Sequence, residues 1–174
     1  MKLKNLIAVA AIALFAAACG STYRATDTGL VVTADARNSF DDLYPNSTSV
    51  VWRTYDPDEF IVVNEWELTG WDPLDQDDYI VEFMDNGEKH YAWFDRDGNW
   101  IGTAVAVSDF TTMPVVVNTT ITKHYPGYTI ASVNKEMHNN MTAYEVTLKS
   151  SNTKVVALVD ANGNIIKYKK KPLN

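Results

Sequence analysis

Residues 79–101 read YIVEFMDNGEKHYAWFDRDGNWI, and residues 144–166 read YEVTLKSSNTKVVALVDANGNII. The two stretches match at an offset of 65 residues, with apolar residues at alternate positions followed by the same Asp-x-x-Gly-Asn sequence. The matched pairs are Tyr79 and Tyr144, Val81 and Val146, Phe83 and Leu148, Asp95 and Asp160, Gly98 and Gly163, Asn99 and Asn164, and Ile101 and Ile166. Self-similarity at a fixed offset indicates a repeated structural unit. The sequence therefore predicts two tandem copies of one module.

A second match lies upstream of each copy. Residues 43–46 read LYPN and residues 124–127 read HYPG, at an offset of 81 instead of 65. The difference of 16 residues indicates an insertion in the first copy, between Trp52 and Asp78. We therefore predict a first repeat at 31–112, with an acidic insertion at about 56–78, and a second repeat at 113–174.

Each copy is predicted to be one helix followed by strands. In the first copy Ala36, Phe40 and Leu43 recur at helical spacing, and Pro45 ends the helix. Residues 114–125 are rich in poor helix formers, so a helix is predicted there from the repeat alone. The predicted strands are 49–55, 79–84, 89–95, 99–107, 129–137, 143–149, 154–160 and 164–169. The fold class is α+β, each repeat being a helix packed on a roughly four-stranded antiparallel sheet.

The dipeptide Asn86-Gly87 predicts a two-residue hairpin turn, because both positions of such a turn need a positive φ. This turn pairs Asp85 with Glu88 and sets the register of both strands. Six residues of the two repeats then face the helices and are predicted to be core: Tyr79, Val81, Phe83, Tyr144, Val146 and Leu148.

The opposite face of the first sheet is predicted to be aromatic. On the same register Ile80, Met84, Tyr91 and Trp93 point away from the helix. Exposed Tyr and Trp side chains are typical of binding surfaces, so these four residues are candidate binding residues. The alternative is that Tyr91 and Trp93 are buried between the repeats or under the insertion.

The insertion is the second candidate for binding. Residues 56–78 contain nine acidic residues, no basic residue, and Trp66 and Trp71. Such an arm is suited to a cationic partner or to weak binding of Ca²⁺, and both tryptophans join the candidate binding surface. The alternative is an extended hairpin with a solvated face.

The N-terminal segment predicts export. Residues 1–19 combine Lys2 and Lys4 with a short apolar stretch and a run of alanines before Cys19, which is typical of a lipoprotein signal peptide. Residues 20–30 read as a tether. Cys19 is thus the predicted lipidation site, although Ala16 stands where such signals usually carry Leu. The alternative is an ordinary secretory signal.

Composition and motifs exclude several classes of function. The formal net charge is −7, and nucleic-acid binding needs a basic face, so no nucleic-acid partner is expected. Lys167, Lys169, Lys170 and Lys171 form the basic cluster, which is interpreted as a solvated chain end. The sequence has no nucleophile elbow, phosphate loop or histidine ligand spacing, so we predict no enzyme, metal or cofactor.

The sequence from Asp95 to Asn99 superficially suggests a calcium loop. An EF-hand loop has glycine at its sixth position and glutamate at its twelfth. Here glycine is fourth and the twelfth position is Ala106, so a turn is predicted.

The succession of helix, Tyr-Pro, strand, Tyr-x-Val, strand and Asp-x-x-Gly-Asn, occurring twice, resembles the PepSY-like, beta-lactamase-inhibitor-protein-like lipoproteins of Gram-negative envelopes. The segments that carry the resemblance are FDDLYPNSTSVVW, YIVEF, YAWFDRDGNWI, ITKHYPGYTI, YEVTL and VDANGNII. It covers roughly residues 31–168 and consists of turn and core residues. It implies two helix-on-sheet units and carries no catalytic motif, and the chain departs from it by the insertion and by Asn46.

Together these observations predict a membrane-anchored lipoprotein that faces the periplasm or the cell surface. We expect a binding or inhibitory module that holds an unknown protein or peptide of the cell envelope on a sheet surface. The alternative is a small-ligand sensor or carrier with an aromatic cleft between the repeats.

Overall fold

The computed structural model describes residues 24–25, 30–56, 70 and 74–173. The signal peptide with Cys19, and most of the insertion with Trp66 and Trp71, lie outside the described residues. Within this part of the chain, no helix is long and apolar enough to cross a membrane.

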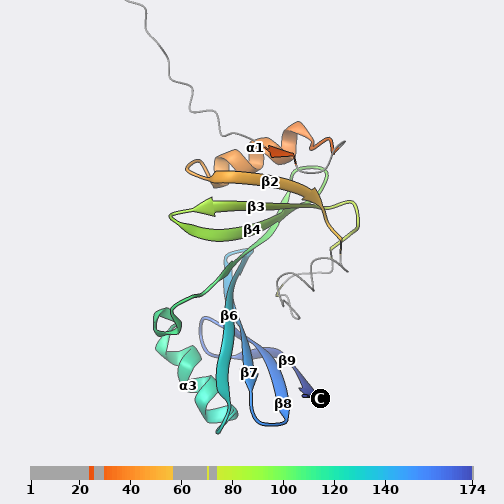
Figure 1. Ribbon diagram of the computed structural model, residues 1–174. Helices are drawn as coiled ribbons and strands as arrows, with labels where there is room; N and C mark the ends of the chain where they lie inside the picture. The colour runs from red at the N-terminus through yellow and green to blue at the C-terminus, as the bar shows by residue number, and fades with distance from the viewer. Residues whose placement is uncertain (1–23, 26–29, 57–69, 71–73, 174) are drawn as a thin grey trace, which may run out of the picture.

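Within the described residues, the fold consists of two α-helices and eight longer strands (Figure 1). The helices are α1 (Ala34–Leu43) and α3 (Val115–His124), and the short 3₁₀ helix η1 (Phe110–Thr112) precedes α3. The strands are β2 (Thr48–Thr54), β3 (Tyr79–Asp85), β4 (Glu88–Phe94), β5 (Trp100–Ala106), β6 (Thr129–His138), β7 (Met141–Lys149), β8 (Thr153–Asp160) and β9 (Ile165–Pro172). A two-residue strand, β1 (Arg24–Ala25), lies within the predicted tether and pairs in parallel with β2.

The strands form one continuous sheet in the order β1 to β9, and from β2 onward neighbouring strands are antiparallel. The predicted α+β class is confirmed, whereas the roughly four-stranded sheet expected for each repeat is not confirmed, because all the described strands belong to one sheet. Strand β5 pairs with β6 from Thr103 opposite Met137 to Ala106 opposite Asn134. The physical reason is that separate sheets would leave two more edges with unpaired backbone groups.

Both helices lie on the same face of this sheet and cover separate cores. In Figure 1, α1 lies over the strands of the upper half and α3 lies beside β6 in the lower half. Phe40 of α1 packs edge-on against Trp52, Phe83 and Phe94. Val117 and Ile121 of α3 belong to a second buried cluster with the inward side chains of β6, β7 and β8.

The register predicted from the Asn86-Gly87 turn is confirmed. Asp85 pairs with Glu88, and Asn86 and Gly87 have φ values of 50° and 82°. All six residues predicted as core from the two repeats are buried. The local turn and the alternation of side chains were sufficient for this result.

The two Asp-x-x-Gly-Asn sequences form the same turn. The carboxylate of Asp95 accepts hydrogen bonds from the Asn99 backbone and side chain, both at 2.8 Å, and Asp160 does the same with Asn164 at 2.8 and 2.9 Å. Within the described residues, no group of three or more His, Cys, Asp or Glu side chains could hold a metal ion.

Each of these turns also supports a helix. The side chain of Thr33, which caps α1, donates to the carbonyl oxygen of Arg96 at 3.1 Å, and Thr120 of α3 donates to that of Gly163 at 2.8 Å. A Cβ added at Gly98 would lie 2.6 Å from the carbonyl carbon of Asp35. The repeated glycine therefore allows a positive φ and the close approach of turn and helix.

Candidate binding surface

The face of the sheet opposite the two helices, here called the helix-free face, runs across the whole molecule. The register places side chains from each of the strands β3 to β9 on it. These side chains are Ile80, Glu82, Met84, Lys89, Tyr91, Trp93, Ala104, Asn134, Glu136, Glu145, Thr147, Val156, Leu158, Lys167 and Lys169. The face thus changes from aromatic and apolar on β3–β5 to acidic on β6–β7 and basic on β9.

The aromatic part is largely covered. Ile80, Tyr91, Trp93 and Ala104 form a third buried cluster, and Trp93 is 1% and Tyr91 8% exposed. The predicted direction of these side chains is correct, but the expected exposure of Tyr91 and Trp93 is not observed. The reason is that Tyr55, Leu74 and Ile101 pack against the cluster. Tyr55 and Leu74 flank the undescribed part of the insertion.

The rim of this cluster is polar and more accessible. The Lys89 ammonium lies 2.7 Å from a carboxylate oxygen of Glu82 and 5.3 Å from the centre of the Tyr91 ring. Burial raises the pKa of the Tyr91 hydroxyl above its ordinary value. Met84, the remaining predicted site residue in this region, is half-buried next to Lys89 on the paired strand.

Two buried carboxyl groups occupy the middle of the helix-free face. Glu136 and Glu145 are 2% and 1% exposed, and the side chain of Asn134 donates to Glu145 at 3.4 Å. The Gly70 backbone N–H donates to one oxygen of Glu136 at 2.7 Å, while the other oxygen has no hydrogen-bond partner among the described residues. Burial, reinforced by the charge of Glu145, raises the pKa of Glu136 to about 8.

A groove opens on the helix side of the second half, between the end of α3 and strand β9. It has a volume of about 900 Å³ and contains three tyrosines. The lining residues are His124, Tyr125, Pro126, Tyr128, Val155, Ile165, Ile166, Lys167, Tyr168 and Lys170. The sequence pattern did not predict this groove, because a basic cluster near a chain end is typical of a solvated tail. The residues of that cluster belong to β9.

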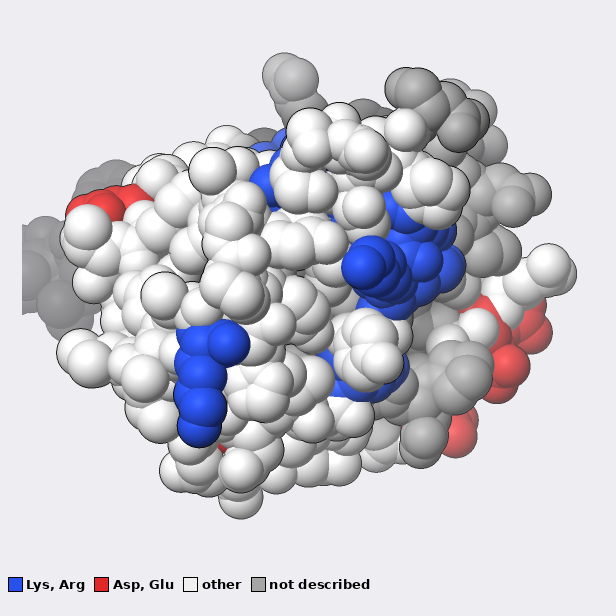
Figure 2. Space-filling model, turned by 90° about the horizontal axis from the view of Figure 1, so that it is seen from below, with Lys and Arg blue, Asp and Glu red and all other residues white. Residues whose placement is uncertain are grey.

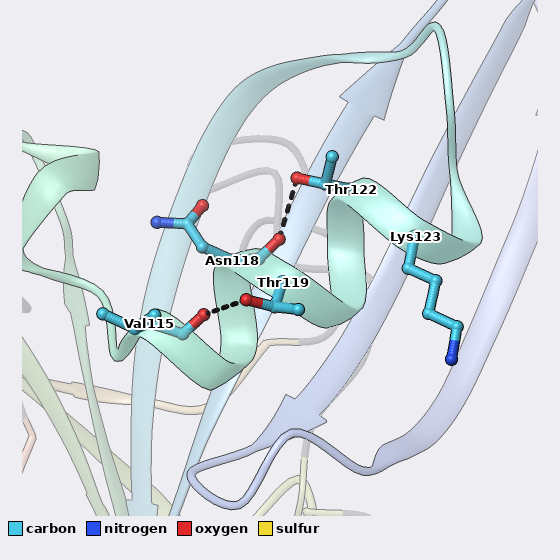
Figure 3. Close-up of a pocket in the computed structure, with 5 residues that line it drawn as sticks. All are labelled: Val115, Asn118, Thr119, Thr122 and Lys123. Atoms are coloured by element: carbon cyan, nitrogen blue, oxygen red, sulfur yellow. Dashed lines mark hydrogen bonds between the residues drawn. The ribbon is translucent and has the colours of Figure 1, made fainter.

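A shallower depression of about 470 Å³ lies on the outer side of α3 (Figure 3). The Thr119 and Thr122 hydroxyls there donate to the carbonyl oxygens of Val115 and Asn118, at 2.8 and 2.9 Å. Their hydroxyl protons are therefore engaged within the helix. The lining of this depression contains no carboxylate or histidine, and Lys123 is the one titratable side chain in it.

Solved structures share this architecture. A BLIP-like protein from Bacteroides fragilis NCTC 9343 has a TM-score of 0.65 at 19% identity, over 84% of this chain and 92% of the other. A DUF2874 family protein from Bacteroides uniformis ATCC 8492 has a TM-score of 0.63 at 19% identity, over 80% and 90%. A structure from Bacteroides eggerthii DSM 20697, described as "putative periplasmic proteins", has a TM-score of 0.62 at 12% identity, over 81% and 90%. At these identities the likeness shows the fold.

The sequence itself identifies the family. No curated protein matches the chain. A family model described as "putative beta-lactamase-inhibitor-like, PepSY-like" matches residues 77–167, just over half of the 174 residues. The match includes both Tyr-x-Val strands and both Asp-x-x-Gly-Asn turns. The chain therefore belongs to the PepSY-like, beta-lactamase-inhibitor-like family.

Proposed function

We propose that this chain is an envelope-anchored module that binds or inhibits a protein or peptide through its helix-free face. The observation that carries the proposal is the accessible rim formed by Glu82, Met84 and Lys89 around Tyr91. Tyr91 is backed by the buried Trp93 and Ile80, so its ring is held in place before a partner arrives. Rigid aromatic anchors inside a polar rim are typical of protein interfaces.

The family and the fold support this proposal, because a BLIP-like neighbour has the same architecture. In this proposal Trp93, Ile80 and the largely buried Tyr91 support the surface, and Met84 and Lys89 contact the partner. Trp66 and Trp71 of the insertion remain candidate contacts outside the described residues. The function proposed is binding without catalysis.

The small-ligand alternative has weaker support. It requires an aromatic cleft between the repeats, but β5 pairs directly with β6 at that junction. Tyr91 and Trp93 pack there against Ala104.

The test is capture from an envelope extract with the soluble chain, followed by direct binding to whatever is captured. Lys89→Glu and Met84→Asp should reduce the affinity by about tenfold or more if the rim contacts the partner. Lys123→Glu, which makes the same charge change on α3, is the matched control. Equal loss with Lys123→Glu, or undiminished binding with both rim variants, would overturn the assignment of the surface.

A further inference from the structure

Strand β9 is exposed on both of its faces. From Ile166 onward every residue of the strand is exposed, including Tyr168 at 65% and Ile166 at 44%. It is also the last strand of the sheet, so one of its edges has no neighbouring strand within the described residues. Alternate residues of such a strand direct their backbone N–H and C=O groups outward, where another extended chain can pair with them.

In the first half of the molecule, hydrogen-bonded side chains occupy the position that corresponds to the groove beside β9. There the Tyr44 hydroxyl is hydrogen-bonded to the Thr103 hydroxyl. The Trp100 indole N–H also donates to the Thr103 hydroxyl, at 2.9 Å. At the repeat offsets, the corresponding residues of the second half are Tyr125, Tyr168 and Ile165. Because Thr is replaced by Tyr and Trp by Ile, these contacts are not made, and the groove of about 900 Å³ remains open.

The chemistry of the groove is aromatic and basic. Strand β9 contains four lysines and no acid, and the groove lining includes Lys167, Lys170 and His124 but no carboxylate. Seen from this end of the molecule, Lys and Arg atoms gather in the central part of the surface, and most Asp and Glu atoms in view lie toward the margins (Figure 2). The groove lining thus contains basic side chains and no acidic one, although the net charge of the chain is −7.

We propose that the open edge of β9 and the adjoining groove bind an extended acidic peptide segment of a partner protein by addition of a strand. Side chains alternate across a strand, so one set of the peptide's side chains would enter the tyrosine-lined groove beside Tyr168. The other set would lie beside Lys167 and Lys169 on the helix-free side. The preferred segment therefore alternates acidic with apolar or aromatic residues.

Charge and backbone geometry favour this occupant over two others. A second copy of β9 would bring four lysines against four lysines, and like charges on paired strands destabilise the pairing. An anionic membrane would attract the lysines of the groove lining but would not pair with the outward backbone N–H groups of the strand. The inference does not rest on the function proposed above, since it concerns a different surface.

A labelled heptapeptide of alternating Glu with Val and Tyr is the probe, and its binding to the soluble chain is measured by fluorescence anisotropy at low ionic strength. We expect saturable binding that weakens by about tenfold or more in Tyr168→Ala and in Lys170→Glu. Lys89→Glu, the same charge change in the first half, should leave the affinity unchanged. N-methylation of one alternate set of peptide residues should abolish binding, whereas N-methylation of the other set should be tolerated.

Four outcomes would overturn the proposal. The first is equal binding of a peptide with the same composition but with its acidic residues grouped at one end. The second is that N-methylation of either alternate set leaves the affinity of the peptide unchanged, which would indicate simple charge attraction. The third is binding to vesicles of anionic phospholipid with no binding to the peptide. The fourth is self-association that Tyr168→Ala removes while the peptide does not bind.

Discussion

The glycine of each Asp-x-x-Gly-Asn turn is required both for its positive φ and because the helix leaves no room for a side chain. Alanine substitutions at Gly98 and at Gly87 separate these two requirements. Gly98 has a φ of 85°, and an added Cβ would lie 2.6 Å from the backbone of Asp35. Gly87 has a φ of 82° with nothing within 4 Å of an added Cβ. Gly87→Ala should therefore cost about 1 kcal/mol of stability from backbone strain alone. Gly98→Ala should cost about 1–3 kcal/mol more, because the helix must move.

Chemical denaturation of the two alanine variants measures this difference directly. Equal destabilisation by both would contradict the close packing of turn and helix.

A second prediction at the residue scale concerns Glu136 and pH. Its pKa is about 8 in the folded chain, against an ordinary value of 4.5, because burial and the neighbouring Glu145 disfavour its charged form. Between these values the folded chain holds a proton that the unfolded chain has released. The contribution of Glu136 to the free energy of unfolding should therefore be fully present below about pH 4.5. It should be lost as the pH rises through about 8.

Glu136→Gln should remove most of this dependence and raise the melting temperature at pH 8, since the amide oxygen can still accept from the Gly70 N–H. Glu88→Gln, at an exposed hairpin position, is the control. Thermal melts between pH 4.5 and 8 are the measurement. A Glu136→Gln profile that follows the unmodified protein would show that this carboxyl group does not control the pH response.

At the scale of the element, the aromatic residues of strand β4 should contribute to the stability of the fold as well as to binding. Trp93 is 1% exposed, so Trp93→Ala should cost about 3–5 kcal/mol, as in other buried aromatic truncations. Tyr91→Ala should also be clearly destabilising. Tyr168→Ala makes the same chemical change at an exposed tyrosine of β9 and should cost little. Urea unfolding curves decide, and a Trp93→Ala variant as stable as Tyr168→Ala would mean that the cluster is not packed.

The helix α3 shows at the same scale how packing overrides propensity. Its sequence is rich in Val and Thr, which are poor helix formers, and no side chain caps its first turn. Val117 and Ile121 are nevertheless buried against the sheet. Burial of these two apolar residues outweighs the weak propensity, as the repeat symmetry predicted.

For the whole molecule, the continuous sheet predicts that the two halves unfold together. All five tryptophans precede residue 101, so tryptophan fluorescence reports mainly on the first half, although the centre of the Trp100 ring lies 6.5 Å from that of His138 in the second half. Val146 in the second half is fully buried, and Val146→Asp should cost several kcal/mol because its carboxylate would lack a partner. If the β5–β6 pairing couples the halves, this variant should also lower the melting temperature seen by tryptophan emission.

Val81→Asp, which changes the first half itself, is the positive control for the fluorescence signal. An unchanged tryptophan transition in Val146→Asp would show that the halves unfold independently.

The anchor is the other prediction at this scale. If Cys19 is acylated, labelled palmitate should appear on the wild-type chain, and Cys19→Ala should release the protein from membranes. Label on the Cys19→Ala variant, or none on the wild type, would end the lipoprotein proposal.

The sequence by itself determined the features that depend on neighbours along the chain. The Asn86-Gly87 turn and the alternation of side chains were sufficient for the register of β3 and β4 and for the six core residues. The Asp-x-x-Gly-Asn turns were also predictable, because their hydrogen bonds join residues four positions apart. Such features follow from local backbone geometry and need no knowledge of the rest of the molecule.

Only the tertiary structure decided which surfaces are covered. Alternation shows that Trp93 and Tyr91 leave the helix side, but not that Leu74 and Tyr55 pack over them. It cannot show that Gly70 contacts Glu136 across 66 positions, or that β5 joins β6 in a single sheet. The groove beside β9 likewise depends on how the end of α3 packs beside β8 and β9. Burial depends on segments distant in sequence. A periodic pattern specifies the side of the sheet to which a side chain points, but not which other segment covers that side.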